Sequence, residues 1–259
     1  MVHLEFKVTW SKSELLTILS VRDFRRSPAQ IIPAKVTDIS TSKGRGRGQG
    51  KARTAAAREL FDQPAALIID LEIGCGVGLH PILRAKEFPD RHLIAIEHTS
   101  EKFNKFASRM ARHPELKNIL PVHADAVQFV SSFVPDARLD HVFLLFPNPE
   151  PKASNKRWMR SPFMHELLRK LKPTGTLQLA TNIESYFREA LLYGEEFWNL
   201  EVISQQSYKL ASLPFPRPRT HFEKKYLERG EFCFDVVFKN NPDRAQEAES
   251  KKLSTRTER

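Results

Sequence analysis

The chain has 259 residues, of which 41% are hydrophobic, enough for one α/β domain with a sizeable core and extensions. Lys and Arg number 41 against 31 Asp and Glu, and this excess favours a polyanionic partner, nucleic acid before a membrane surface. Two cysteines are too few for a disulfide framework, and no apolar run approaches a signal peptide core or a membrane span. We therefore expect a soluble, cytoplasmic protein with no membrane partner.

The chain divides into three parts by composition. Residues 1–57 form a basic N-terminal extension, expected to be partly flexible, with a Gly- and Arg-rich stretch at 40–51 that cannot bury a core. That stretch is either an arm that touches RNA phosphates or a solvated linker. Residues 58–240 form the folded domain, and residues 241–259 are predicted to be a disordered, charged tail.

Within the domain, apolar runs alternate with amphipathic segments, which is typical of a parallel sheet. The expected strands are residues 67–72, 92–97, 119–124, 139–146, 176–181, 197–203 and 232–238, the last two antiparallel. The expected helices are residues 79–88, 101–113, 127–133, 163–171 and 183–192, and residues 214–225 are expected to form a proline-rich basic loop. This order predicts an α/β, Rossmann-like fold with a seven-stranded, mostly parallel sheet.

Three alternate glycines, Gly74, Gly76 and Gly78, follow the first strand and precede a helix. This is the layout of a nucleotide-type cofactor site, because glycine permits a tight turn and a close approach by a ligand. Leu79 stands where a dinucleotide fingerprint has its third glycine. The spacing, with Glu72 two residues upstream, favours S-adenosyl-L-methionine, whose cationic amino-acid end a carboxylate can hold. The alternative is a glycine turn without a ligand.

Two further acids follow strands. Glu97 ends the second strand about 20 residues after the glycines, where an acid accepts hydrogen bonds from ribose hydroxyls. Asp125 leaves the third strand just before Ala126, so it can accept from an adenine amino group, cap the next helix, or do both. We expect S-adenosyl-L-methionine as the cofactor and no metal ion.

The fourth strand ends in a stiff loop at residues 146–152, which contains three prolines. Ligands of such folds bind at this edge of the sheet. Basic residues and an aromatic follow: Lys152, Lys156, Arg157, Trp158 and Arg160. Cations with an aromatic suit phosphate and base contacts, and the alternative is a solvated charged surface.

Several of these segments together resemble one family, the bacterial tRNA (guanine-N7)-methyltransferases. The matching segments are residues 72–78, 96–97, 125–126, 146–152, 180–182 and 217–223. They occur in the family's order over roughly residues 67–238, and the segment from Arg217 to Glu223 is the most family-specific.

The resemblance implies a role for each matching residue. Those implied to bind the cofactor are Glu72, Gly74, Gly76, Gly78, Glu97, Asp125, Ala126 and Asn148. Those implied to hold the guanine are Lys152, Asn182, Thr220 and Glu223, with Asn155, Lys156 and Arg157 on the RNA backbone. Asn148 also takes the position of the catalytic Asp. The chain departs from the family at Asn148 and Asn182, where the family has Asp, and at Glu150, where it has Trp.

Guanine N7 carries a lone pair and no proton, so its methylation needs an in-line approach and accommodation of a purine cation rather than a general base. Asn148 can position a substrate but cannot neutralise that cation. Losing one charge-assisted contact costs about 1.5–3 kcal/mol, which slows such a reaction without forbidding it. Asn182 can likewise accept one hydrogen bond through its amide oxygen.

Methyl transfer from S-adenosyl-L-methionine to an RNA base, with guanine N7 in tRNA leading, is thus the first hypothesis. Asn148-Pro149 also resembles the Asn-Pro-Pro-aromatic loop of methyltransferases that act on exocyclic amino groups of nucleic-acid bases, although the aromatic is missing here. A third hypothesis is a non-catalytic homologue that binds the cofactor or RNA.

Overall fold

The computed structural model describes residues 56–150 and 156–241. The N-terminal extension up to residue 55, the tail from residue 242, and the site candidates Lys152 and Asn155 lie outside the described residues. The predictions of a flexible arm, of a disordered tail and of roles for these two side chains therefore stay predictions.

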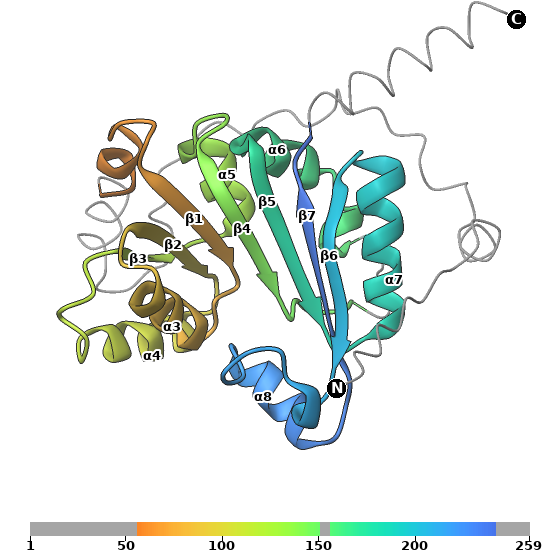
Figure 1. The fold of residues 1–259 in the computed structure, drawn as a ribbon. Helices are drawn as coiled ribbons and strands as arrows, with labels where there is room; N and C mark the ends of the chain where they lie inside the picture. The colour runs from red at the N-terminus through yellow and green to blue at the C-terminus, as the bar shows by residue number, and fades with distance from the viewer. Residues whose placement is uncertain (1–55, 151–155, 242–259) are drawn as a thin grey trace, which may run out of the picture. The chain divides into compact units, whose positions relative to one another are not determined.

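A seven-stranded sheet forms the centre of the domain, in the order β3-β2-β1-β4-β5-β7-β6 (Figure 1). The strands are β1 (Ile68–Ile73), β2 (Arg91–Glu97), β3 (Ile119–His123), β4 (Leu139–Leu145), β5 (Leu171–Thr181), β6 (Glu201–Tyr208) and β7 (Cys233–Lys239). Neighbours pair in parallel except β7, which runs antiparallel to both β5 and β6. The predicted Rossmann-like, mostly parallel sheet is confirmed.

Six α-helices connect or flank the described strands: α3 (Leu79–Glu87), α4 (Ser100–Met110), α5 (Ala126–Phe133), α6 (Phe163–Lys170), α7 (Glu184–Leu192) and α8 (His221–Glu228). Helices α3 and α4 pack on β2 and β3, α5 packs on α6, and α7 packs on β5 and β7. Helix α8 lies beyond the carboxyl ends of the parallel strands (Figure 1). Among the described residues no helix has the length and apolarity that a bilayer crossing requires.

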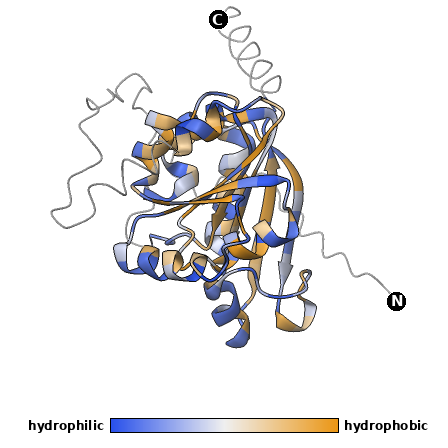
Figure 2. Ribbon diagram, turned by 90° about the vertical axis from the view of Figure 1, so that its left-hand side faces the viewer, coloured by the Kyte–Doolittle hydropathy of each residue, from blue (hydrophilic) through white to orange (hydrophobic). Residues whose placement is uncertain are grey.

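The core lies along the middle strands, which are apolar on both faces because helices cover a parallel sheet on both sides. Fully buried side chains on these strands include Leu71, Val142, Leu144, Leu177 and Leu179. In Figure 2 the central strands are largely hydrophobic, whereas the surrounding helices carry hydrophilic residues. This rigid centre fixes the positions of the loops that leave the strands.

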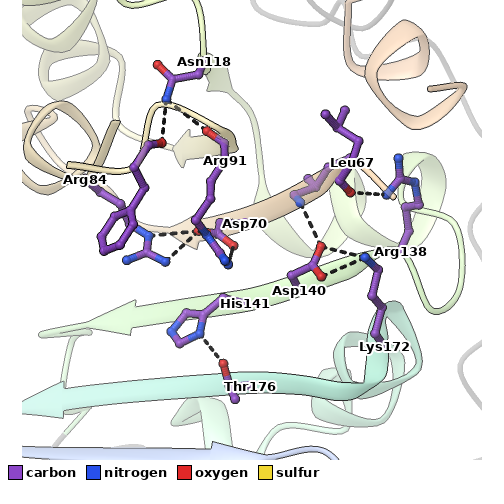
Figure 3. Close-up of polar contacts among 12 residues, drawn as sticks. Leu67, Asp70, Arg84, Arg91, Asn118, Arg138, Asp140, His141, Lys172 and Thr176 are labelled. Carbon is purple, nitrogen blue, oxygen red and sulfur yellow. Dashed lines mark hydrogen bonds and ion pairs between the residues drawn. The ribbon is translucent and has the colours of Figure 1, made fainter. Parts of the chain in front are cut away.

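A set of ion pairs joins the amino-terminal halves of the strands (Figure 3). Asp70 on β1 is fully buried and accepts hydrogen bonds from Arg84 at 2.9 Å and from Arg91 Nε at 3.0 Å. Asp140 on β4 pairs with Lys172 on β5 at 2.8 Å. Because a buried carboxylate is costly unless it is paired, the Asp70 contacts hold β1 to α3 and β2, and the half-buried Asp140–Lys172 pair joins β4 to β5. The pattern of apolar residues gives no sign of them.

Most predicted elements begin and end within a residue of the observed ones, but four predictions are wrong in part. The helix predicted over 101–113 ends at Met110, and β5 begins at Leu171 rather than residue 176. Strand β6 spans Glu201–Tyr208 rather than residues 197–203. It begins later because a π-helical turn, Tyr193–Phe197, extends α7 and stacks Phe197 on Tyr193.

The predicted loop at residues 214–225 is a helix from His221 onwards. The Thr220 hydroxyl oxygen caps α8 by accepting a hydrogen bond from the Glu223 backbone N–H at 3.0 Å. This cap satisfies one of the free N–H groups at the helix start, so the helix begins directly after the proline-rich segment.

Candidate cofactor and substrate site

The three glycines after β1 all have left-handed backbones, with φ of +79° at Gly74, +60° at Gly76 and +79° at Gly78. They serve two purposes. A Cβ at Gly78 would lie 1.9 Å from the Phe106 ring, so this glycine lets α4 pack on the turn. A Cβ at Gly74 or Gly76 would meet nothing within 4 Å. These two glycines therefore border open space, which a ligand can approach closely.

Two buried carboxylates flank this turn. Glu72 on β1 is 2% exposed and accepts a hydrogen bond from His80 Nδ1 at 2.7 Å when that nitrogen carries the proton. Glu97 at the end of β2 is 5% exposed and accepts from the backbone N–H groups of Gly76 at 2.9 Å and Thr99 at 2.7 Å. Each carboxylate keeps lone pairs for further donors.

The turn is a site of negative potential. Burial raises the pKa of the Cys75 thiol well above its ordinary value, and the charges of Glu72 and Glu97 raise it further. Burial disfavours any ion, but the two carboxylate charges oppose one more anion and favour a cation. The open, acidic turn therefore fits a positively charged ligand such as the sulfonium and ammonium end of S-adenosyl-L-methionine.

Asp125 caps α5, as one of its two predicted roles requires. Its Oδ1 accepts a hydrogen bond from the Gln128 backbone N–H at 2.9 Å, and Ala126 begins the helix as a buried residue. The Asp125 side chain is exposed at the carboxyl edge of the sheet. Its role toward adenine stays a prediction.

The loop after β4 is strained and carries a pair of polar side chains. Phe146 and Glu150 have φ of +52° and +45°, in the left-handed region that non-glycine residues rarely adopt. Asn148 is exposed, and its Nδ2 donates to Glu150 Oε1 at 2.9 Å. The Glu150 N–H donates back to Asn148 Oδ1 at 3.3 Å. Strained backbone of this kind gathers at functional sites, where surrounding contacts hold it.

Arg157 is one of those contacts. Its Nε donates to the Pro149 carbonyl at 2.6 Å, and its Nη1 pairs with Glu189 on α7 at 2.8 Å. The guanidinium also lies over the Tyr186 ring, 5.2 Å from its centroid. Arg157 thus ties the loop to α7, whereas Lys156 beside it is exposed.

At the end of β5, Asn182 meets an acid that sequence reasoning missed. Asn182 Nδ2 donates to Glu231 Oε2 at 2.8 Å. Glu231 lies just before β7, and β7 pairs with β5, so the sheet brings together two residues that are far apart in the sequence. An acid in a loop before a strand is too common a pattern to have indicated this contact.

Glu223, predicted to hold guanine, lies in a buried network under α8. It is fully buried, and its carboxylate accepts from Arg219 Nη2 at 2.7 Å and from the Tyr208 hydroxyl. Arg219 also pairs with Asp235 on β7 at 2.7 Å. Burial alone would raise the pKa of Glu223, but the Arg219 guanidinium outweighs it and lowers that pKa. This network anchors α8 to β6 and β7.

The sheet register brings the predicted residues to one edge. Glu72 pairs with Ala95 of β2 and with Phe143 of β4, and the Phe146 N–H donates to the Ala180 carbonyl of β5 at 2.7 Å. The strand ends and loops that carry Glu72, Glu97, Asn148 and Asn182 are therefore neighbours. Helix α8, with Thr220 at its start, reaches across to α4.

That crossing contact has two parts. Arg109 Nη1 on α4 lies 2.9 Å from His221 Nε2, and Lys102 Nζ lies 5.7 Å from the centroid of the Phe222 ring. Helices α4 and α8 therefore bracket the carboxyl edge between β2 and β5, where the acidic turn and the β4 loop lie.

The fold, the acidic glycine turn and the acid at the end of β2 define a Rossmann-like methyltransferase. The 16S rRNA methyltransferase KamB shares this fold, with a TM-score of 0.53 and 16% identity over 74% of this chain and 94% of that one. Residues 67–236 match the family described as "Putative methyltransferase".

The tRNA (guanine-N(7)-)-methyltransferase of Neisseria gonorrhoeae is 32% identical over 65% of this chain and 70% of its own length. That of Neisseria meningitidis serogroup A is 30% identical over 85% of this chain and 91% of its own length. The chain belongs to this family of bacterial tRNA (guanine-N7)-methyltransferases, as the sequence motifs predicted.

Proposed function

We propose that this protein transfers the methyl group of S-adenosyl-L-methionine to N7 of a guanine in tRNA. The observation that carries the proposal is the open turn at Gly74 and Gly76 between two buried carboxylates, in a chain of this family. When bound, the cofactor supplies an electrophilic methyl group on a sulfonium ion.

The acidic turn supports a division of roles within the cofactor site. Glu72 is proposed to hold the cationic amino-acid end, which its burial and its single imidazole partner leave it able to do. Glu97 is proposed to accept from the ribose hydroxyls, because two backbone N–H groups already fix its carboxylate. Asp125 is proposed to accept from the adenine amino group with the oxygen that does not cap α5.

The β4 loop is proposed to orient the guanine. N7 carries no proton, so the chain needs no general base, and its contribution is in-line placement together with a negative environment for the purine cation. Asn148 supplies a polar contact but no charge. Glu150, which the Asn148 amide holds at 2.9 Å, brings a carboxylate to the same loop and offsets that loss.

The RNA backbone is proposed to meet the exposed Lys156, together with Asn155, and Lys152 is proposed to contact the guanine. Arg157 supports this surface from behind, since its guanidinium is engaged with Pro149 and Glu189. This division separates a phosphate contact from a residue that positions the loop.

The exocyclic-amine alternative is less well supported. That chemistry needs the Asn148 oxygen to accept hydrogens from the substrate amine beside an aromatic side chain, and in the sequence Pro151 stands where that loop has its aromatic. A non-catalytic homologue would bind the cofactor or RNA without turnover, so a genetic test separates all three.

Deleting the gene and measuring methylated nucleosides in total tRNA by mass spectrometry is the test. We expect 7-methylguanosine to disappear, to return with the wild-type gene, and to return to a lower level with a Glu72→Gln gene. An unchanged 7-methylguanosine level would refute the guanine N7 assignment. Loss of a methylamino base instead would establish the alternative chemistry.

A further inference from the structure

We infer that Glu231 is a specificity-determining residue, whose carboxylate accepts hydrogen bonds from the N1–H and the amino group of the substrate guanine. We infer also that Asn182 positions the Glu231 carboxylate. The inference rests on the proposed function and deepens it. Glu231 lies outside the matching family motifs, and its contact with Asn182 does not follow from the sequence.

The fold brings Asn182 and Glu231 together at one edge of the sheet. Asn182 follows the last residue of β5, and Glu231 lies two residues before Cys233, the first of β7. The antiparallel register pairs Thr181 with Phe234, which brings the two side chains together at the carboxyl edge of the sheet. The 2.8 Å hydrogen bond from Asn182 Nδ2 then fixes Oε2 of Glu231.

The Glu231 carboxylate can still accept hydrogen bonds from a ligand. The nearby Glu223 and Asp235 are buried and satisfied by Arg219. The Glu231 side chain is 36% exposed, and its Oε1 lies 3.8 Å from Arg229 Nη1, which is too long for a hydrogen bond. Of these three acids, Glu231 is therefore the one that keeps free lone pairs and is exposed enough to meet a ligand.

The chain repeats this amide–carboxylate arrangement at the end of the neighbouring strand, β4. At the end of β4, Asn148 Nδ2 donates to Glu150 Oε1 at 2.9 Å, as Asn182 does to Glu231. Two amides thus each hold a glutamate at adjacent strand ends. The edge keeps its negative charge although both strand-end residues are neutral.

The chemistry of the two groups decides which one reads the base. Guanine presents the N1–H and an amino N–H side by side, and a carboxylate offers two acceptor oxygens to match them. An amide presents its acceptor oxygen beside an NH₂ group that can only donate, and one N–H of Asn182 already donates to Glu231. Adenine presents an unprotonated N1 at this edge, which a carboxylate repels. Glu231 therefore favours guanine over adenine.

The test is a set of matched variants assayed for methyl transfer to tRNA, cofactor binding by calorimetry, and melting temperature. Glu231→Gln should lower kcat/KM for tRNA about 10- to 100-fold, the scale of a lost charged hydrogen bond. Its cofactor affinity and melting temperature should match the wild type. The double variant Asn182→Asp/Glu231→Gln, which moves the carboxylate across the contact, should recover most of the lost kcat/KM.

Two controls separate base reading from a surface ion pair. Glu228→Gln removes an exposed glutamate of α8, 3.7 Å from Lys224, and should leave kcat/KM unchanged. Arg229→Gln removes the charged neighbour of Glu231 and should also have little effect. Wild-type kcat/KM in Glu231→Gln, or an equal loss in Arg229→Gln, would overturn the inference. Absence of turnover in the wild type would instead overturn the proposed function itself.

Discussion

Replacing Gly78 with alanine tests whether this glycine is needed for packing, whereas Gly76 is needed to leave space for the cofactor. The new methyl group would lie 1.9 Å from the Phe106 ring, and the residue would keep a φ of +79°. A left-handed backbone costs an ordinary residue about 1–2 kcal/mol, and an overpacked methyl group costs about 1–3 kcal/mol more. Gly78→Ala should therefore lower the free energy of unfolding by about 2–5 kcal/mol.

Gly76→Ala is the matched control. Its φ is +60°, but its Cβ would meet nothing within 4 Å, so only the backbone cost of about 1–2 kcal/mol applies. The methyl group would instead occupy the space proposed for the cofactor. We expect Gly76→Ala to be the more stable variant and the poorer binder.

Urea denaturation with a common slope, followed by calorimetric titration of the folded variants with S-adenosyl-L-methionine, measures both effects. Equal destabilisation by the two substitutions would refute the packing role of Gly78. Wild-type affinity in Gly76→Ala would refute the view that this glycine makes room for the cofactor.

Three further predictions concern buried charges. Glu72→Gln should weaken cofactor binding about 10- to 100-fold by calorimetry, against no change for the exposed Glu87→Gln, and an unchanged dissociation constant would remove Glu72 from the site. Arg219→Gln leaves two buried carboxylates unpaired and should cost about 3–5 kcal/mol in urea denaturation, so a loss below about 1 kcal/mol would contradict the buried network. Burial lowers the pKa of His141 to about 4 from an ordinary 6.5. The unfolded chain then binds a proton that the folded chain does not, so stability should fall by up to about 3 kcal/mol between pH 6.5 and 4. His141→Gln should flatten that pH dependence, and an equal slope in both proteins would be the contrary result.

Local signals made the cofactor edge predictable from the sequence. Alternate glycines next to an apolar run indicate a turn, and an acid that ends a strand keeps its place whatever the distant contacts are. Gly74, Gly76 and Glu97 therefore lie where the sequence placed them. The sequence also carried a signal for the start of α8, because Thr220 and Glu223 have the spacing of a capping box. The prolines before them instead favoured the prediction of a loop.

The substrate edge was not predictable in the same way, because its contacts join distant segments. Asn182 contacts Glu231 because β7 lies between β5 and β6 in the sheet. The sequence around either residue does not indicate this strand order. Glu223 is turned into the fold by Arg219 and Tyr208, which its motif does not reveal. Family motifs identify positions, and the long-range pairing determines what each side chain can still bind.

The most direct test of the proposed activity is a reaction of the purified wild-type protein with tRNA transcripts and methyl-labelled S-adenosyl-L-methionine, followed by nucleoside analysis of the product. We predict label in 7-methylguanosine, formed over several turnovers and reduced about 10- to 100-fold by Glu72→Gln at limiting cofactor. Cofactor binding without any labelled nucleoside, or label in a nucleoside other than 7-methylguanosine, would contradict methyl transfer to guanine N7.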